Sequence, residues 1–296
     1  MAGKNNKNKI LKAVIPAAGY GTRFLPATKA QPKEMLPIVD KPIIQYVVEE
    51  AVASGVKDVI LVTGWQKRSI EDHFDYPFEL EKFLLKAGKI QQLKEVRRIA
   101  DMANFIYLRQ KGPYGNATPV LCAKHVIGQE PFAVLWGDEF IYAKPPRLQQ
   151  MTKVFAKYKY PVISAVRIKD KKEVSRYGIA KVKPVARGVF QILQIVEKPD
   201  PERAPSNLAT HGGYIFTPEI FYYLEKLKPG KGGEFWLVDA INAYMKKKPV
   251  YACEIKNSKY YDTGNKLEYL KANIDFALMR KEYKSELLSY LKEITC

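Results

Sequence analysis

Apolar residues along this chain gather into short unbroken runs that alternate with longer stretches in which they recur every three to four positions. A run of about four to eight apolar residues is typical of a buried strand, and the longer spacing is typical of a helix with one buried face. We therefore expect strands at 12–16, 58–63, 104–109, 132–136, 162–168 and 250–254, a hairpin-like pair at 178–182 and 189–196, and helices at 42–54, 66–101, 118–126, 145–158 and 266–290.

The first strand, the helix at 42–54 and the strand at 58–63 follow one another as a βαβ unit. Pro42 suits the first turn of the helix, and Gly55 suits its end. A βαβ unit implies parallel strands joined by a right-handed crossover. The pattern thus predicts an α/β fold with a Rossmann-like mixed, mainly parallel sheet flanked by helices. Ligands of such sheets bind at the carboxyl ends of the strands, where the segment after the first strand lies.

That segment, residues 16–37, has two glycines, four prolines, one Arg and two Lys, which indicates a loop of fixed shape over an anion. Gly19 and Gly21 allow the backbone to approach a ligand closely, and phosphate is the ligand that the cations favour. A dinucleotide-binding fingerprint is excluded because its third Gly is replaced by Phe24. No P-loop run occurs either, so the loop is a phosphate site of another kind.

The run Gly19-Tyr-Gly-Thr-Arg23, followed ten residues later by Lys33 of a Pro-Lys pair, resembles the signature loop of the sugar-nucleotidyltransferases. The longer run Pro32-Lys-Glu-Met-Leu-Pro-Ile-Val-Asp-Lys-Pro42 is similar to the bacterial branch that uses UTP and glucose 1-phosphate. The resemblance covers about residues 10–282 and implies the nucleotide-diphospho-sugar transferase fold. In this reading residues 1–9 are a disordered basic tail, 10–282 are the nucleotidyltransferase domain, and 283–296 form a C-terminal helix that packs on the domain or on a partner subunit.

The resemblance also implies which residues hold the nucleotide. Arg23 and Lys33 are the catalytic cations that hold the triphosphate. A Gln amide donates and accepts hydrogen bonds, so Gln110 can meet the N3–H and a carbonyl of uracil together. The family has a second Gly where this chain has Ala117, which removes any role that needed close backbone approach there. The remaining nucleotide-binding candidates are Ala17, Ala18, Gly19, Gly21, Thr22 and Gly115.

Two carboxylates are the candidate metal ligands. Asp138 follows a buried strand directly, which places it at the ligand edge of the sheet, where Mg²⁺ and a triphosphate need it. Asp262 matches the Asp-x-Gly turn that supplies the second metal carboxylate in the superfamily. Glu139 stands where many relatives have a second Asp. The expected cofactor is Mg²⁺.

The sugar phosphate site is expected at Glu197-Lys198-Pro199, together with Gly178. The resemblance assigns Glu197 to the sugar hydroxyls and Lys198 to a phosphate. Relatives commonly have Gly-Arg-Tyr where this chain has Gly212-Gly213-Tyr214, so that Arg contact cannot be carried over. His211 is read as structural. The sequence leaves glucose and galactose both open as the sugar.

Charge and composition narrow the class of protein. The net charge is +18, but Lys residues interleave with acids and no nucleic-acid-binding signature occurs, so we expect no nucleic acid partner. A positive field also favours capture of anionic substrates. No apolar run is long enough for a membrane span, and no secretory signal is visible, so a cytoplasmic protein is expected. The three cysteines form no disulfide or zinc pattern.

The expected reaction is transfer of a uridylyl group from UTP to α-D-glucose 1-phosphate, which gives UDP-glucose and pyrophosphate. Two alternatives stay open at this point. One is a relative that uses dTTP, and the other is a regulatory subunit with this fold that binds sugar nucleotide without turnover. The C-terminal helix favours a homo-oligomer, a dimer or tetramer, because an amphipathic helix needs cover for its apolar face.

Overall fold

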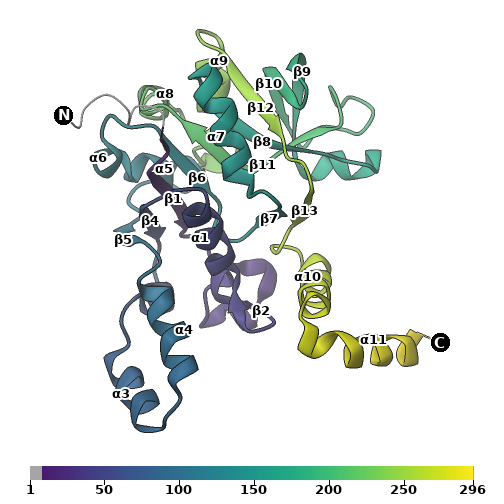
Figure 1. Ribbon diagram of the computed structural model, residues 1–296. Helices are drawn as coiled ribbons and strands as arrows, with labels where there is room; N and C mark the ends of the chain where they lie inside the picture. The colour runs from purple at the N-terminus through teal and green to yellow at the C-terminus, as the bar shows by residue number, and fades with distance from the viewer. Residues whose placement is uncertain (1–8, 296) are drawn as a thin grey trace.

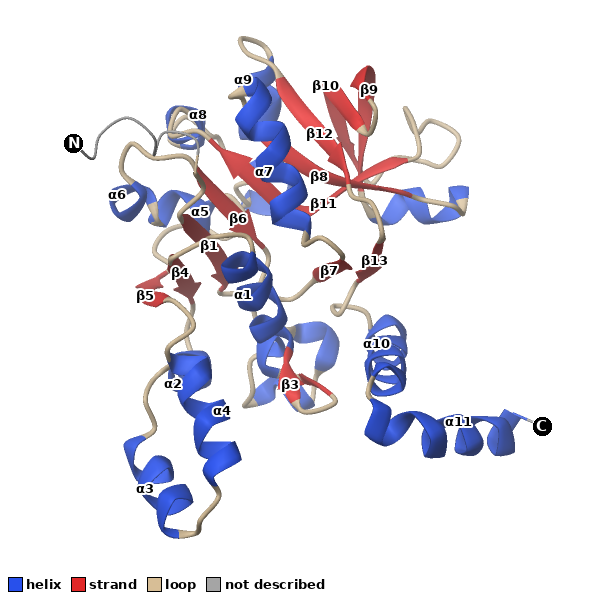
Figure 2. Ribbon diagram, in the orientation of Figure 1, coloured by secondary structure: helices blue, strands red, loops and turns tan. Residues whose placement is uncertain are grey.

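The computed structural model describes residues 9–295, and its centre is one nine-stranded sheet in the order β5-β4-β1-β6-β11-β8-β12-β10-β9 (Figure 1). Two small antiparallel pairs, β2–β3 and β7–β13, stand beside it (Figure 2). The strands are β1 (Lys12–Ala17), β2 (Pro37–Ile38), β3 (Lys41–Pro42), β4 (Asp58–Thr63), β5 (Asn104–Arg109), β6 (Phe132–Leu135), β7 (Phe140–Ala143), β8 (Val162–Arg167), β9 (Gly178–Ala186), β10 (Val189–Glu197), β11 (Leu208–Phe216), β12 (Val250–Glu254) and β13 (Ser258–Tyr261). The α/β fold predicted from the apolar runs is confirmed.

The sheet has two halves that differ in strand direction. Strands β5, β4, β1 and β6 are parallel to one another, as the βαβ unit requires. In the other half β12 is parallel to β8, but β11 and β10 pair antiparallel with every neighbour. The apolar pattern gave no strand at 206–219, yet this segment supplies β11, which joins the halves. Antiparallel pairing is therefore a larger part of the mixed sheet than the sequence pattern indicated.

Helices cover both faces of the sheet because strands such as β1 are buried on both sides. Ala13 and Ile15 of β1 belong to one core and Val14 to the other, and all three are fully buried. The first core includes side chains of α1 (Ile43–Ala53), α2 (Arg68–Phe74), α7 (Arg147–Tyr158) and α10 (Lys266–Met279). The second includes side chains of α5 (Thr118–Cys122), α6 (Lys124–Ile127), α8 (Ile220–Leu224) and α9 (Leu237–Met245). The predicted helix at 42–54 is α1, which starts after Pro42 and stops before Gly55.

Two helical arms project from the domain (Figure 1). One consists of α3 (Phe78–Lys86) and α4 (Ile90–Ala100), which lie in the stretch 66–101 predicted to be helical and are separated around Gly88. The other consists of α10 and α11 (Lys281–Thr295), and α11 has no buried residue. No helix within residues 9–295 is long and apolar enough to cross a membrane. The predicted basic tail, apart from Lys9, lies outside the described residues.

Candidate active site

The glycine-rich loop after β1 folds back so that Lys33 lies against its glycines. The loop contains three short turns, η1 (Thr22–Phe24), η2 (Ala27–Lys29) and η3 (Lys33–Met35). Gly21 has φ 68°, a left-handed conformation that favours Gly, and its carbonyl accepts a hydrogen bond from Thr28 Oγ1 at 2.7 Å. A Cβ on Gly19 would lie 3.5 Å from Lys33 Nζ. Local backbone geometry thus brings Lys33 beside Gly19 and Gly21.

A second loop, which follows β5, faces the first. Gln110 N donates to Thr63 O at 2.9 Å, which keeps this residue in line with the strand edge. Gly115 has φ 127°, and a Cβ there would lie 2.2 Å from Phe235 O, so close contact with the Phe235 backbone already requires Gly at this position. The hydroxyls of Tyr20 and Tyr114 form a hydrogen bond that joins the two loops. The predicted nucleotide contacts of Gln110 and Gly115 stay predictions.

The predicted cations and carboxylates meet at the carboxyl edge of the parallel strands. Lys33 Nζ forms an ion pair with Asp138 Oδ2. Thr263 Oγ1 donates to the backbone carbonyl of Asp138, which brings the turn after β13 to the same place. Arg23 Nη1 donates to Gly264 O of that turn at 3.1 Å. Three distant segments therefore place Arg23, Lys33, Asp138 and Asp262 in one region.

The ion pair is stable in its charged form because each partner acts on the other. Burial alone raises the pKa of Asp138, but Lys33 and then Arg23 outweigh it, and the pKa falls below its usual value. Burial alone lowers the pKa of Lys33, but Asp138 and Glu34 raise it above the ordinary value. Asp138 is therefore a carboxylate, and Lys33 an ammonium, over the whole neutral range.

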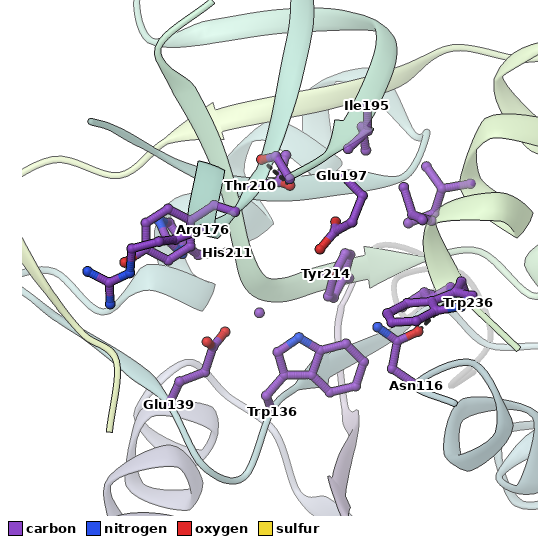
Figure 3. A pocket seen from close by; sticks show the side chains of 16 residues that line it. Asn116, Trp136, Glu139, Arg176, Ile195, Glu197, Thr210, His211, Tyr214 and Trp236 are labelled. Atoms are coloured by element: carbon purple, nitrogen blue, oxygen red, sulfur yellow. Dashed lines mark hydrogen bonds between the residues drawn. The ribbon is translucent and has the colours of Figure 1, made fainter. Parts of the chain in front are cut away.

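Beside this region lies a cavity of about 150 Å³ between β9, β10, β11 and the start of α9. Figure 3 shows Glu139 and Glu197 reaching into it from opposite sides. Glu197 is paired with Gly178 across the β9–β10 register, and a Cβ on Gly178 would lie 3.0 Å from Glu197 Oε2. The lining residues are Asn116, Trp136, Glu139, Arg176, Tyr177, Gly178, Ile195, Glu197, Thr210, His211, Gly212, Tyr214, Trp236, Leu237, Val238 and Ile241.

Lys198 lies next to this cavity but does not line it. It has φ 46°, and its backbone N–H donates to Tyr177 O at 3.0 Å. Its side chain lines a neighbouring groove with Glu197, Glu234, Trp236, Val238 and Asp239. Burial raises the pKa of Glu197, and the Lys198 charge opposes that shift. Glu197 thus belongs to both hollows and connects Lys198 with the cavity.

Two of the charged residues that line the cavity, Glu139 and Arg176, were not assigned a role from the sequence. Glu139 accepts a hydrogen bond from Tyr260 Oη at 2.6 Å, and burial, followed by the charge of Asp138, raises its pKa to about 7. Arg176 Nη2 donates to Asp262 Oδ2 at 2.9 Å. In the sequence, Arg176 is an Arg among charged neighbours before a strand. That context does not distinguish it from an ordinary solvated side chain.

Residues 211–213, which include the departure from the family pattern at Gly213, are closely packed. His211 is buried, as the structural reading predicts, and burial lowers its pKa to about 3, so its ring is neutral. A Cβ on Gly212 would lie 1.9 Å from Glu139 Oε1. A Cβ on Gly213 would lie 2.8 Å from Ser164 Oγ and 3.2 Å from Arg147 Nε. A side chain at either position would require these neighbouring side chains to shift.

Comparisons with known proteins agree with this geometry. The family model described as nucleotidyl transferase matches residues 12–277. A UTP–glucose-1-phosphate uridylyltransferase of Bacillus subtilis (strain 168) is 48% identical over 288 residues, which cover 97% of this chain and 96% of that protein.

Solved structures give the same result. A UDP-glucose pyrophosphorylase complexed with UDP-glucose superposes with a TM-score of 0.83 at 42% identity, covering 92% of this chain and 100% of that one. A UTP-bound UGPase from Acinetobacter baumannii has a TM-score of 0.88 at 37% identity, covering 96% and 99%. The chain therefore belongs to the nucleotidyl transferase family and, within it, to the group of bacterial UTP–glucose-1-phosphate uridylyltransferases.

Proposed function

We propose that this protein transfers the uridylyl group of UTP to α-D-glucose 1-phosphate and releases pyrophosphate. The observation that carries the proposal is that the glycine-rich loop and the carboxylate edge are joined by the Lys33–Asp138 ion pair, directly beside the cavity that holds Glu197. Relatives of this chain are named for this reaction, and one related structure contains UTP and another UDP-glucose.

The chemistry needs no nucleophilic side chain from the protein. The phosphate oxygen of glucose 1-phosphate attacks the α-phosphorus of UTP, a P–O bond forms, and the bond to the departing pyrophosphate breaks. A phosphate dianion is already a competent nucleophile, so the protein contributes positioning and neutralisation of charge. These are the two things that a cluster of Arg, Lys and carboxylates can supply.

On the nucleotide side, Arg23 and Lys33 hold the triphosphate. The backbone of Ala17, Ala18, Gly19, Gly21 and Thr22 surrounds the nucleotide, with Gly115 on the opposite loop. Support comes from the contact of Lys33 with the glycines, since an ammonium beside exposed backbone N–H groups favours phosphate oxygens. Gln110 reads the uracil edge from the end of β5.

On the sugar side, Glu197 accepts hydrogen bonds from sugar hydroxyls, and Gly178 leaves the space in front of its carboxylate free. Lys198 holds the sugar phosphate from the neighbouring groove. Support comes from the direction of Glu197, whose carboxylate points into the cavity (Figure 3). A carboxylate that has few protein partners in a cavity is suited to hydroxyl recognition.

We place the metal between the nucleotide side and the sugar side of the site. Nucleotidyl transferases generally use a divalent metal ion, and we assign Mg²⁺ to Asp138 and Asp262. The donors fit, because Mg²⁺ prefers oxygen ligands and is held by one or two carboxylates together with substrate phosphates. Within residues 9–295, no group of three or more His, Cys, Asp or Glu side chains is placed so that it could hold a metal ion. When bound, the ion supplies neutralisation of phosphate charge.

The protein is further proposed to act in the cytoplasm as a homo-oligomer. The exposed apolar residues of α10 and α11, among them Leu270, Met279, Leu288 and Ile294, support contact with a second copy. Sedimentation of the purified protein would test this: a monomer at micromolar concentration contradicts it.

The test of function is pyrophosphate release with each nucleoside triphosphate crossed against each hexose 1-phosphate. UTP with glucose 1-phosphate should give the highest kcat/KM, and UDP-glucose should appear in equal amount to pyrophosphate. Faster turnover with dTTP would identify a thymidylyl-transferring enzyme instead. Binding of UDP-glucose without turnover of any pair would identify a regulatory subunit.

A further inference from the structure

Arg176 lies at the border between the cavity and the predicted metal ligands. It is the last residue of η4 (Lys171–Arg176), directly before Tyr177 and β9. Its Nη2 donates to Asp262 Oδ2 at 2.9 Å, its Nη1 lies 3.3 Å from Glu173 Oε1, and its guanidinium stands over the Tyr177 ring. About one third of the side chain is exposed, so it can reach a ligand in the cavity.

The two carboxylates assigned to the metal are both paired with cations in the chain alone. Asp138 is paired with Lys33, and Asp262 is paired with Arg176. A divalent ion on Asp262 competes with the Arg176 guanidinium for the negative charge of that carboxylate, and the two cations repel each other. Metal binding at Asp262 therefore favours release of Arg176 from this ion pair.

Once released from Asp262, the Arg176 guanidinium can bind a second anion, a phosphate group in the cavity. Among the cavity-lining residues of the described chain, Arg176 is the one Lys or Arg, and His211 beside it is neutral. Lys198, by contrast, lines the neighbouring groove. The planar fork of an Arg matches a phosphate group with two parallel hydrogen bonds, which an ammonium cannot do.

We propose that Arg176 is a sugar-phosphate-binding residue. It pairs with Asp262 in the metal-free protein, and when the metal binds it moves to the phosphate of glucose 1-phosphate. Asp262 exchanges Arg176 for the divalent ion as its partner, and Arg176 exchanges Asp262 for the sugar phosphate. The inference rests on the proposed function, because it takes a hexose 1-phosphate as the occupant of the cavity. It makes metal binding and sugar phosphate binding mutually favourable.

The test uses Arg176→Gln and Arg176→Lys, with Arg187→Gln as the matched control. Arg187 lies in the exposed turn between β9 and β10 and loses the same charge without touching the cavity. Mn²⁺ binding to the substrate-free protein, measured by electron paramagnetic resonance, should tighten at least about threefold in Arg176→Gln because the competitor for Asp262 is gone. The control should match wild type.

Steady-state kinetics provides the second measurement. In Arg176→Gln the KM for glucose 1-phosphate should rise at least about tenfold, while the KM for UTP stays within about twofold of wild type. Arg176→Lys should recover part of the loss. Thermal melting checks the fold; should the Gln variant melt early because Asp262 is unpaired, the Lys variant carries the comparison.

Each outcome decides something. Unchanged Mn²⁺ affinity in Arg176→Gln overturns the exchange at Asp262, and an unchanged KM for glucose 1-phosphate, or an equal rise in both KM values, overturns the phosphate contact. A wild type that makes no UDP-glucose refutes the proposed function instead, and the Mn²⁺ measurement still tests the exchange on its own.

Discussion

The two halves of the sheet present their functional side chains in different ways. In the parallel half, the candidate residues Ala18, Gln110 and Asp138 follow the ends of β1, β5 and β6 within a few positions. In the other half, Gly178 begins β9, Glu197 ends β10, and the two meet because the β9–β10 register sets them opposite each other. One half uses loops that follow single strands, and the other uses residues of two neighbouring strands that are paired with each other.

The difference teaches where a short sequence pattern is informative. A loop at a strand end carries its own geometry in its glycines and prolines, so local sequence predicts it. A contact between residues of two paired strands depends on which strands pair and in what register, which local sequence does not specify. We therefore expect substitutions in the two halves to affect different substrates, and the first prediction concerns the residue that joins them.

Asp138→Asn should have the largest effect, because Asp138 is the partner of Lys33 and a proposed metal ligand. We expect kcat to fall about 100- to 1,000-fold, since loss of one preorganised charge typically costs that much. Circular dichroism should show an unchanged fold, and Asp72→Asn, on the exposed face of α2, should leave kcat unaltered. Full activity of the wild type in excess EDTA would refute the metal assignment.

Gly178→Ala should weaken the use of glucose 1-phosphate without affecting UTP, and so distinguish the two halves of the sheet. A Cβ there lies 3.0 Å from both Glu197 Oε2 and Thr210 Oγ1, so the Glu197 carboxylate must move, at a cost of about 1 to 3 kcal/mol. The KM for glucose 1-phosphate should rise about tenfold, and the KM for UTP should not change. Gly19→Ala is the corresponding variant on the nucleotide side: its methyl would lie in ordinary contact with Lys33 Nζ at 3.5 Å, beside the proposed triphosphate site, and should affect UTP alone. If either variant raises both KM values equally, the two halves are not independent.

Gln110→Ala should affect only the choice of base. Uracil and thymine share the edge that Gln110 reads, so dTTP should rank close behind UTP, whereas cytosine leaves the amide badly paired. The wild-type order should be UTP, dTTP, CTP, and the variant should lose about 1 to 3 kcal/mol of the preference for UTP over CTP. The measurement is kcat/KM for each triphosphate, with Gln92→Ala on the arm as control. An unchanged UTP:CTP ratio removes Gln110 from the site.

Deletion of Met1 to Asn8 should affect neither half. Ile10 is buried and Lys12 Nζ donates to Val126 O at 3.0 Å, and the deletion keeps both residues. Melting temperature and kcat/KM should match the full chain. Deletion through Lys12 should lower the melting temperature, and a drop already in the shorter deletion would contradict the prediction.

Most of the fold could be predicted because buried strands leave unbroken apolar runs. The segment that became β11 escaped, since Gly212 and Gly213 interrupt its run and glycine is poor in strands. Those glycines are present because Glu139, Trp136, Arg147 and Ser164 occupy the space beside them, which no local pattern reveals.

The site could be predicted where a motif fixes it. Lys33, Asp138 and Asp262 lie together as the resemblance implied, although their roles stay predictions. Arg176 could not be found, because its partner Asp262 is 86 residues away and an Arg among charged neighbours is usually solvated. Lys198 was expected beside Glu197. Its position in a separate groove depends on its positive φ, which the sequence does not predict.

The position of β11 also has a consequence for synthesis of the chain on the ribosome. β6 is paired on one side with β1, and its other edge stays open until residues 208–216 have emerged. While β8, β9 and β10 are being synthesised, the nascent chain therefore exposes the unpaired edge of β6, an apolar strand. Unpaired strand edges of this kind pair with other chains and promote aggregation. We expect the yield of this protein to depend on chaperones that shield β6 until β11 closes the gap.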